Sequence, residues 1–162
     1  MQATKILMTA ATLGLAACAT YSSAPPAYGP GGDAMAGTSL ITTGNKAPFG
    51  VFLVDAGGRS VYMLEGTRGQ TGMNRCTGAC LNVWPPVKAT APLTVGGTVD
   101  PARLTTVPGP WGPQAAYDGW PLYYYHHDRA PGDTTGQHVT DAWGTWHLLA
   151  PSGQPIRPAG GY

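Results

Sequence analysis

The sequence predicts a small, mainly β domain, and three observations support that prediction. Gly 24 and Pro 16 together make up about a quarter of the 162 residues, a density that breaks long helices. Charged residues are only 10%, yet five Trp and eight Tyr are present, the reverse of a disordered chain. Short apolar runs separated by Gly turns are typical of β-hairpins. We therefore expect one domain of two related β-hairpin repeats packed around one aromatic core, with a short helical turn near a Cys pair.

The N-terminus has the pattern of an export signal. Lys5 precedes the apolar run 6–17, which is too short to span a bilayer but typical of a secretory signal. The run ends Leu-Ala-Ala before Cys18, which resembles a bacterial lipobox, where the Cys is lipidated and becomes the mature N-terminus. We predict that 1–17 is a lipoprotein signal peptide and that Cys18 is the lipidation site. The alternative is an ordinary signal peptide cleaved nearby, with Cys18 incidental.

Lipidation at Cys18 would make the bilayer a partner of this chain. Two or more acyl chains give stable attachment, and bacterial lipoproteins that this sequence resembles carry a diacylglycerol and usually a third chain, such as palmitate. Ala19 follows, rather than the Asp that commonly signals inner-membrane retention, so we expect the outer membrane. Removal of Lys5 with the signal leaves 8 basic against 8 acidic side chains. Lipid, rather than surface charge, would then hold the protein at its membrane.

The stretch after Cys18 reads as a tether. Residues 19–46 are rich in Pro, Gly, Ser and Ala, and they have neither the strand nor the helix period. We therefore predict a lipidated Cys and flexible tether over 18–46 and a β-rich domain over 47–162. The alternative is that residues 38–43, which are more apolar, add a strand to the domain.

Two hairpins with the same plan follow. The first runs over 49–65 and turns at residues 56–58, because Gly tolerates positive φ. The second runs over 114–128 and turns at Asp118-Gly119. Aligning Gly58 with Gly119 makes Tyr62 the counterpart of Tyr123. We infer an internal duplication, with repeats about 49–88 and 113–151.

Each repeat continues through a Gly- and Thr-rich stretch to a Trp. The first half reaches Trp84, and the second reaches Trp143 and Trp146. A last strand is predicted over 145–150, and a weak strand at 93–95 lies in the segment that joins the halves.

Two cysteines remain once Cys18 is assigned to lipid. Cys76 and Cys80 form an even pair in an oxidising compartment, and the Thr-Gly-Ala between them lets the chain turn sharply enough for a disulfide. Such a bridge would fix a tight turn and seat Trp84. The alternatives are a copper site, with both thiolates and either His126 or His147 as ligands, and a thiol-redox pair.

A Tyr-x-aromatic-x-x-Asp pattern is present at Tyr123, Tyr125 and Asp128. On a strand the two tyrosines point to one face, and Asp128 lies just past its end. The aromatics could fill the core while Asp128 accepts hydrogen bonds from turn amides or a Tyr hydroxyl. Alternatively, they could form an exposed platform for a sugar or a peptide.

These motifs together resemble a bacterial lipoprotein family, the secreted repeat of unknown function, or predicted lipoproteins with a Yx(FWY)xxD motif. The resemblance covers about 49–150 and rests on the lipobox, the aromatic motif, the Cys-x3-Cys element followed by Trp-Pro-Pro, and a Pro-Gly-Asp turn at 131–133. The first repeat keeps Tyr62 but has Leu64 and Thr67 where the motif has an aromatic and Asp. The resemblance implies a fold and an envelope location, and it assigns no mechanism.

Several functional classes are disfavoured by the sequence. No Lys/Arg run is present, so no nucleic-acid partner is expected. Glu65 is the only Glu, and neither a Gly-x-Ser-x-Gly elbow nor a His-Glu-x-x-His motif occurs, so we expect no enzyme and no cofactor. The leading prediction is a membrane-anchored envelope lipoprotein with a non-enzymatic structural or ligand-binding role toward an unidentified envelope ligand or protein. The alternatives are a periplasmic copper-binding or thiol-redox protein, and a carbohydrate-binding module.

Overall fold

The computed structural model describes residues 40–70, 75–90 and 92–157. Within them the fold is mainly β, as predicted, and one short helix follows the first cysteine of the pair. The predicted signal peptide, Cys18 and most of the predicted tether lie outside the described residues. The elements are β1 (Leu40–Lys46), β2 (Gly50–Asp55), β3 (Tyr62–Leu64), α1 (Cys80–Val83), β4 (Thr94–Val95), the 3₁₀ turn Pro101–Arg103, β5 (Leu104–Gly109), β6 (Gly112–Tyr117), β7 (Trp120–Pro121), β8 (Thr140–Asp141) and β9 (Gly144–Leu148).

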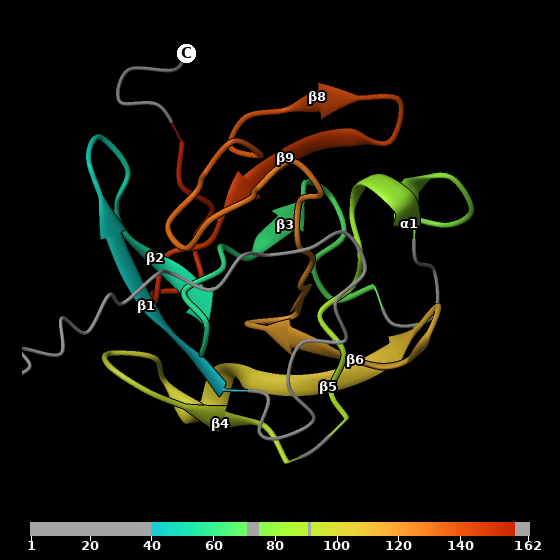
Figure 1. The fold of residues 1–162 in the computed structure, drawn as a ribbon. Helices are drawn as coiled ribbons and strands as arrows, with labels where there is room; N and C mark the ends of the chain where they lie inside the picture. Colours follow the sequence, from blue (N-terminus) through green and yellow to red (C-terminus); the bar gives the residue numbers. More distant parts are fainter. Residues whose placement is uncertain (1–39, 71–74, 91, 158–162) are drawn as a thin grey trace, which may run out of the picture.

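The strands form three small sheets, with the orders β2-β1-β4, β3-β9-β8 and β5-β6-β7. In Figure 1, β8 and β9 lie on the side of the domain opposite to β5 and β6, and β3 lies between them. The weak strand predicted at 93–95 is β4, and the predicted last strand is β9.

The prediction that the tether extends to residue 46 is wrong at its end. Residues Leu40–Lys46 form β1, which pairs antiparallel with β2 from Ile41 opposite Asp55 to Lys46 opposite Gly50. The start of β1 also pairs in parallel with β4. Ile41 is only 1% exposed, so its burial stabilises the strand in a stretch whose composition is typical of a linker. The described part of the β domain therefore starts at residue 40, and the alternative of an added strand is the one that the structure has.

Both predicted hairpins are present, and each has its own turn chemistry. In the first turn, Oδ1 of Asp55 accepts hydrogen bonds from the backbone N–H groups of Gly57 and Arg59, and Gly58 has φ 78°. In the second, Asp118 and Gly119 both have positive φ, 49° and 80°, as a tight two-residue hairpin turn requires. The local Gly signals thus fix where both hairpins reverse.

The two hairpins meet at their corresponding tyrosines. The N–H of Tyr62 donates to the carbonyl of Tyr123 at 2.8 Å, and the N–H of Tyr123 donates back to the carbonyl of Tyr62 at 2.9 Å. Such a reciprocal pair between counterparts is the pattern of an approximate two-fold axis. The duplication inferred from the sequence is therefore expressed in the hydrogen bonding.

The halves also exchange their last segments. In the first half, the N–H of Leu53 donates to the carbonyl of Leu149 from the second half at 2.9 Å. In the second half, the N–H of Ala115 donates to the carbonyl of Val87 from the first half at 2.8 Å. The pairing of β3 with β9 belongs to the same exchange. Because each hairpin is completed by the other half, the two repeats form one fold.

The core has two parts that follow from this arrangement. One is mainly aliphatic and includes Leu53, Val61, Met63 and Leu122. The other is aromatic and contains the disulfide; its buried members are Phe52, Val54, Tyr62, Leu64, Cys76, Cys80, Leu81, Trp84, Tyr123, Trp146 and Leu148. The aromatic core that the sequence predicts is thus present, with a second, aliphatic part beside it.

Candidate functional site

Two tryptophans, one from each half, stack at the centre of the aromatic cluster. The rings of Trp84 and Trp146 have centroids 3.9 Å apart and planes inclined by only 8°, and both side chains are fully buried. Tyr62 packs edge-on against Trp84, and Tyr123 packs edge-on against Trp146, at 5.6 and 5.2 Å. Trp146, rather than Trp143, is therefore the counterpart of Trp84. The stack is made of corresponding side chains that meet between the repeats.

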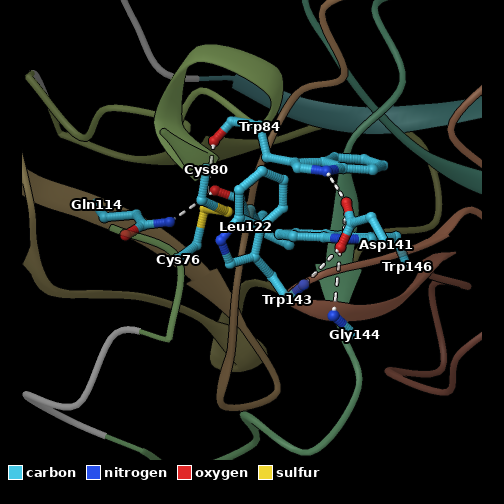
Figure 2. Close-up of a disulfide and its surroundings, with 9 residues drawn as sticks. All are labelled: Cys76, Cys80, Trp84, Gln114, Leu122, Asp141, Trp143, Gly144 and Trp146. Atoms are coloured by element: carbon cyan, nitrogen blue, oxygen red, sulfur yellow. Dashed lines mark hydrogen bonds between the residues drawn. A yellow bond between two sulfur atoms is a disulfide. The ribbon is translucent and has the colours of Figure 1, made fainter. Parts of the chain in front are cut away.

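One carboxylate holds both indoles of this stack. Oδ2 of Asp141 accepts the Nε1–H of Trp84 at 2.8 Å and that of Trp146 at 3.1 Å. Its Oδ1 accepts the backbone N–H groups of Trp143 and Gly144. Figure 2 shows Asp141 at the edge of the two stacked rings. The sequence indicates only a turn Asp here; its bonds to indoles in both halves depend on tertiary structure.

The two cysteines are bonded to each other, so the predicted disulfide is confirmed. Cys76 and Cys80 are fully buried in the aromatic cluster, with Cα atoms 5.2 Å apart. Helix α1 starts at Cys80, and the carbonyl of Cys80 accepts the backbone N–H of Trp84 at 2.7 Å. Figure 2 shows the bridge beside the stacked tryptophans. The disulfide turn thus leads directly into the buried Trp.

The copper-site hypothesis does not match this arrangement. The bonded sulfurs of Cys76 and Cys80 are not the thiolates that a soft metal requires. Among the described residues, no group of three or more His, Cys, Asp or Glu side chains is placed to hold a metal ion.

The two candidate His ligands have different surroundings. The ring of His126 lies 3.6 Å from that of His127, and burial followed by the neighbouring His127 lowers the pKa of His126. His147, on β9, is only 4% exposed; its Nε2 lies 3.9 Å from the Glu65 carboxylate and its ring 5.2 Å from that of His138. Burial is the main cause that lowers the pKa of His147.

The motif carboxylate connects the two halves. Oδ2 of Asp128 accepts the hydroxyl of Tyr62 at 2.7 Å. Its Oδ1 accepts both the backbone N–H and the hydroxyl of Thr135, at 2.9 and 2.6 Å. Asp128 is 6% exposed. The motif Asp of the second half therefore bonds the motif Tyr of the first half, which sequence spacing alone does not indicate.

Tyr62 acts as a hydrogen-bond donor at this site. Burial, followed by the adjacent Asp128 carboxylate, raises the pKa of the Tyr62 hydroxyl far above its ordinary value. The hydroxyl therefore stays protonated at physiological pH and keeps its proton for Asp128. It also accepts the backbone N–H of Gly136 at 3.3 Å.

The motif aromatics do not form an exposed platform, so that alternative is wrong for these residues. Tyr123 is fully buried. Tyr125 is half-buried and stacks on Trp84, with ring centroids 4.3 Å apart. The face that carries both tyrosines is covered because the first half of the chain packs against it. A sugar ring would find neither a flat exposed aromatic nor a free carboxylate at this motif.

Together, the fold and the site define a small, disulfide-containing β domain built from two repeats that exchange strands. Residues 106–150 match the family described as secreted repeat of unknown function, which confirms the family resemblance. The matched segment contains the complete aromatic motif and the exchanged strand β9. Neither the curated proteins nor the solved structures compared with this chain include a match. In the part of the chain that the structure describes, no helix has the length and apolar character needed to cross a bilayer.

Proposed function

We propose that this chain is a lipid-anchored protein of the bacterial envelope whose β domain has a non-enzymatic structural or ligand-binding role. One observation carries the non-enzymatic part of the proposal: the polar groups of the motif are used within the fold. Asp128 accepts three hydrogen bonds from Tyr62 and Thr135. A general acid or base would need to reach a substrate proton.

A second carboxylate, that of the half-buried Asp141, supports the same conclusion. Asp141 accepts four hydrogen bonds, two from indoles and two from backbone amides. All four donors are neutral groups of the fold itself. Each of the two carboxylates therefore connects the second half to the first, Asp128 through Tyr62 and Asp141 through Trp84.

The sequence supports the anchor. Cys18 follows a short apolar run and three small or apolar residues, in the position where bacterial lipoproteins are lipidated. The family description as a secreted repeat is consistent with an envelope location. Ala19 and the balanced charge of the chain after Cys18 favour attachment to the outer membrane through lipid.

Metabolic labelling tests the anchor. The full chain would be produced in a Gram-negative host that is fed an alkyne fatty acid, and compared with Cys18→Ser. We expect the wild type to carry the label and to sediment with membranes, and Cys18→Ser to lose the label.

The Cys76→Ser/Cys80→Ser double variant is the matched control, because it removes the other two thiols and leaves Cys18. It should remain labelled. Label in the Cys18→Ser chain, or an unlabelled wild type, would refute the anchor.

A further inference from the structure

The tip of the β5–β6 hairpin is apolar and exposed. Residues 107–113 read Val-Pro-Gly-Pro-Trp-Gly-Pro and contain no charged side chain. Trp111 is 48% exposed, and Pro108, Pro110 and Pro113 are exposed around it. Within the described residues, Val51 is the one other large hydrophobic side chain that is exposed to a similar degree. The tip therefore presents an uncharged apolar surface that is available for a contact outside the domain.

The hairpin that carries this tip is rigidly built. β5 and β6 pair without interruption from Leu104 opposite Tyr117 to Gly109 opposite Gly112. Next to the tip, the amide of the buried Gln114 donates to the carbonyl of Leu122 at 2.8 Å, as Figure 2 shows. The neighbouring N–H of Ala89 donates to the carbonyl of Pro113 at 2.9 Å. The tip is therefore presented by a fixed scaffold, so little conformational entropy would be lost when it docks.

Trp111 also has a cation beside it. The ammonium of Lys88 lies 5.6 Å from the centroid of the Trp111 ring. Trp is enriched at membrane–water interfaces, where its ring lies at the headgroup level, and the long Lys side chain can keep its charge in water beside it. The pair therefore fits the interface of a bilayer.

We propose that the β5–β6 tip docks in the interface of the bilayer, with Trp111 inserted at the headgroup level. The inference rests on the proposed lipid anchor, because attachment through Cys18 keeps the bilayer close. The chain between Cys18 and Leu40 is only 21 residues long. Attachment raises the effective concentration of the membrane at the tip, so a contact that would be weak in solution is sufficient.

Docking would give the domain an orientation. With the tip at the headgroup level, the β5–β6 hairpin would point toward the bilayer and would limit rotation of the domain relative to the membrane. The docked hairpin would then act as a second attachment point beside the acyl chains.

Trp fluorescence in proteoliposomes tests the docking. The full lipidated chain would be reconstituted in phosphatidylethanolamine–phosphatidylglycerol vesicles that contain lipids brominated near the headgroup. We expect quenching of Trp emission in the wild type, and equal quenching in the Val51→Ala control. Trp111→Ala should lose the quenching while its melting temperature stays unchanged, because the side chain is exposed. Wild-type emission that is not quenched, or equal quenching in Trp111→Ala, would overturn the proposal.

Flotation separates this failure from failure of the anchor. A chain that floats with the vesicles but is not quenched is anchored without docking, which refutes only the docking. A chain that does not float refutes the anchor, and the docking with it. Retention on peptidoglycan sacculi that depends on Trp111, without quenching in vesicles, would assign the tip to a glycan and would also overturn the docking.

Discussion

The two halves of the domain have the same side chains where they meet and different side chains around that junction. Tyr62 and Tyr123 pair with each other, and Trp84 and Trp146 stack on each other. Around these pairs, the first half has the Cys76–Cys80 disulfide, and the second supplies Asp141, which bonds both indoles. The shared residues thus form the junction between the repeats, while each half stabilises that junction by its own chemistry.

The aromatic motif differs between the halves for the same reason. Asp128 of the second half accepts the Tyr62 hydroxyl of the first. Its counterpart, Thr67, instead donates to the carbonyl of Leu64 within its own turn, at 2.7 Å. The second half is therefore the one that keeps the carboxylate, and it is also the half that matches the family description. Because its main contact lies in the other half, the motif Asp connects the two repeats.

Separating the two halves should reduce the stability of the fold more than any other change. We predict that chains 18–96 and 97–162, produced separately, do not fold alone, because each hairpin is completed by the last segment of the other. Mixed at equal concentration, they should form a 1:1 complex with the near-UV circular dichroism of the intact domain. Gel filtration and calorimetry would check this. Cooperative melting of either fragment as a monomer would contradict the exchange of strands.

Removal of one stacked indole should be the next most damaging change. Trp84→Ala and Trp146→Ala should each lower the free energy of unfolding by about 3–5 kcal/mol, because each leaves a large cavity in the aromatic cluster. Trp111→Ala is the matched control and should change it by less than about 0.5 kcal/mol, because that ring is exposed. Urea unfolding measures all three. If Trp84→Ala and Trp146→Ala lowered the free energy of unfolding by very different amounts, the two positions would not be equivalent.

Acidification should lower the stability of the domain by a smaller amount, because His147 in the second half becomes protonated. Burial lowers the pKa of His147, whose neighbours are Glu65, His138 and Arg157. The pKa of the His side chain in the unfolded chain is about 6.5. Neutral His147 therefore contributes its full stabilisation above that pH, and this stabilisation decreases as the pH falls below it.

The urea midpoint of the wild type should therefore decrease between pH 7.5 and 5.5. The decrease should be smaller in His147→Gln and unchanged in the control Trp111→Ala, whose ring is exposed and does not titrate. An identical pH dependence in His147→Gln would exclude this residue as the cause.

The sequence predicts the features that depend on neighbouring residues. Gly58 and Asp118-Gly119 mark the hairpin turns because their backbone conformations are local properties. The Cys76–Cys80 disulfide is likewise a local feature, because the small Thr-Gly-Ala residues between the cysteines let the sulfurs meet. These signals are enough to give the class of fold and its duplication.

Features that depend on distant partners are predicted only as alternatives or without their partners. β1 resembles a linker in composition, and it becomes a strand because β2 pairs with it and Ile41 is buried. The bond between Tyr62 and Asp128 joins residues in different repeats, and no spacing within the motif encodes it. Asp141 likewise resembles an ordinary turn residue until the two tryptophans are brought to its carboxylate.

The bond between Tyr62 and Asp128 offers the most direct test that the motif joins the two repeats. The measurement is a double-mutant cycle with Tyr62→Phe, Asp128→Asn and the double variant, followed by urea unfolding. Each single substitution should lower the free energy of unfolding by about 1–3 kcal/mol, because it impairs or removes the hydrogen bond between two buried partners. The double variant should cost at least about 1 kcal/mol less than the sum of the single changes. Additive costs, within about 0.5 kcal/mol, would contradict the account.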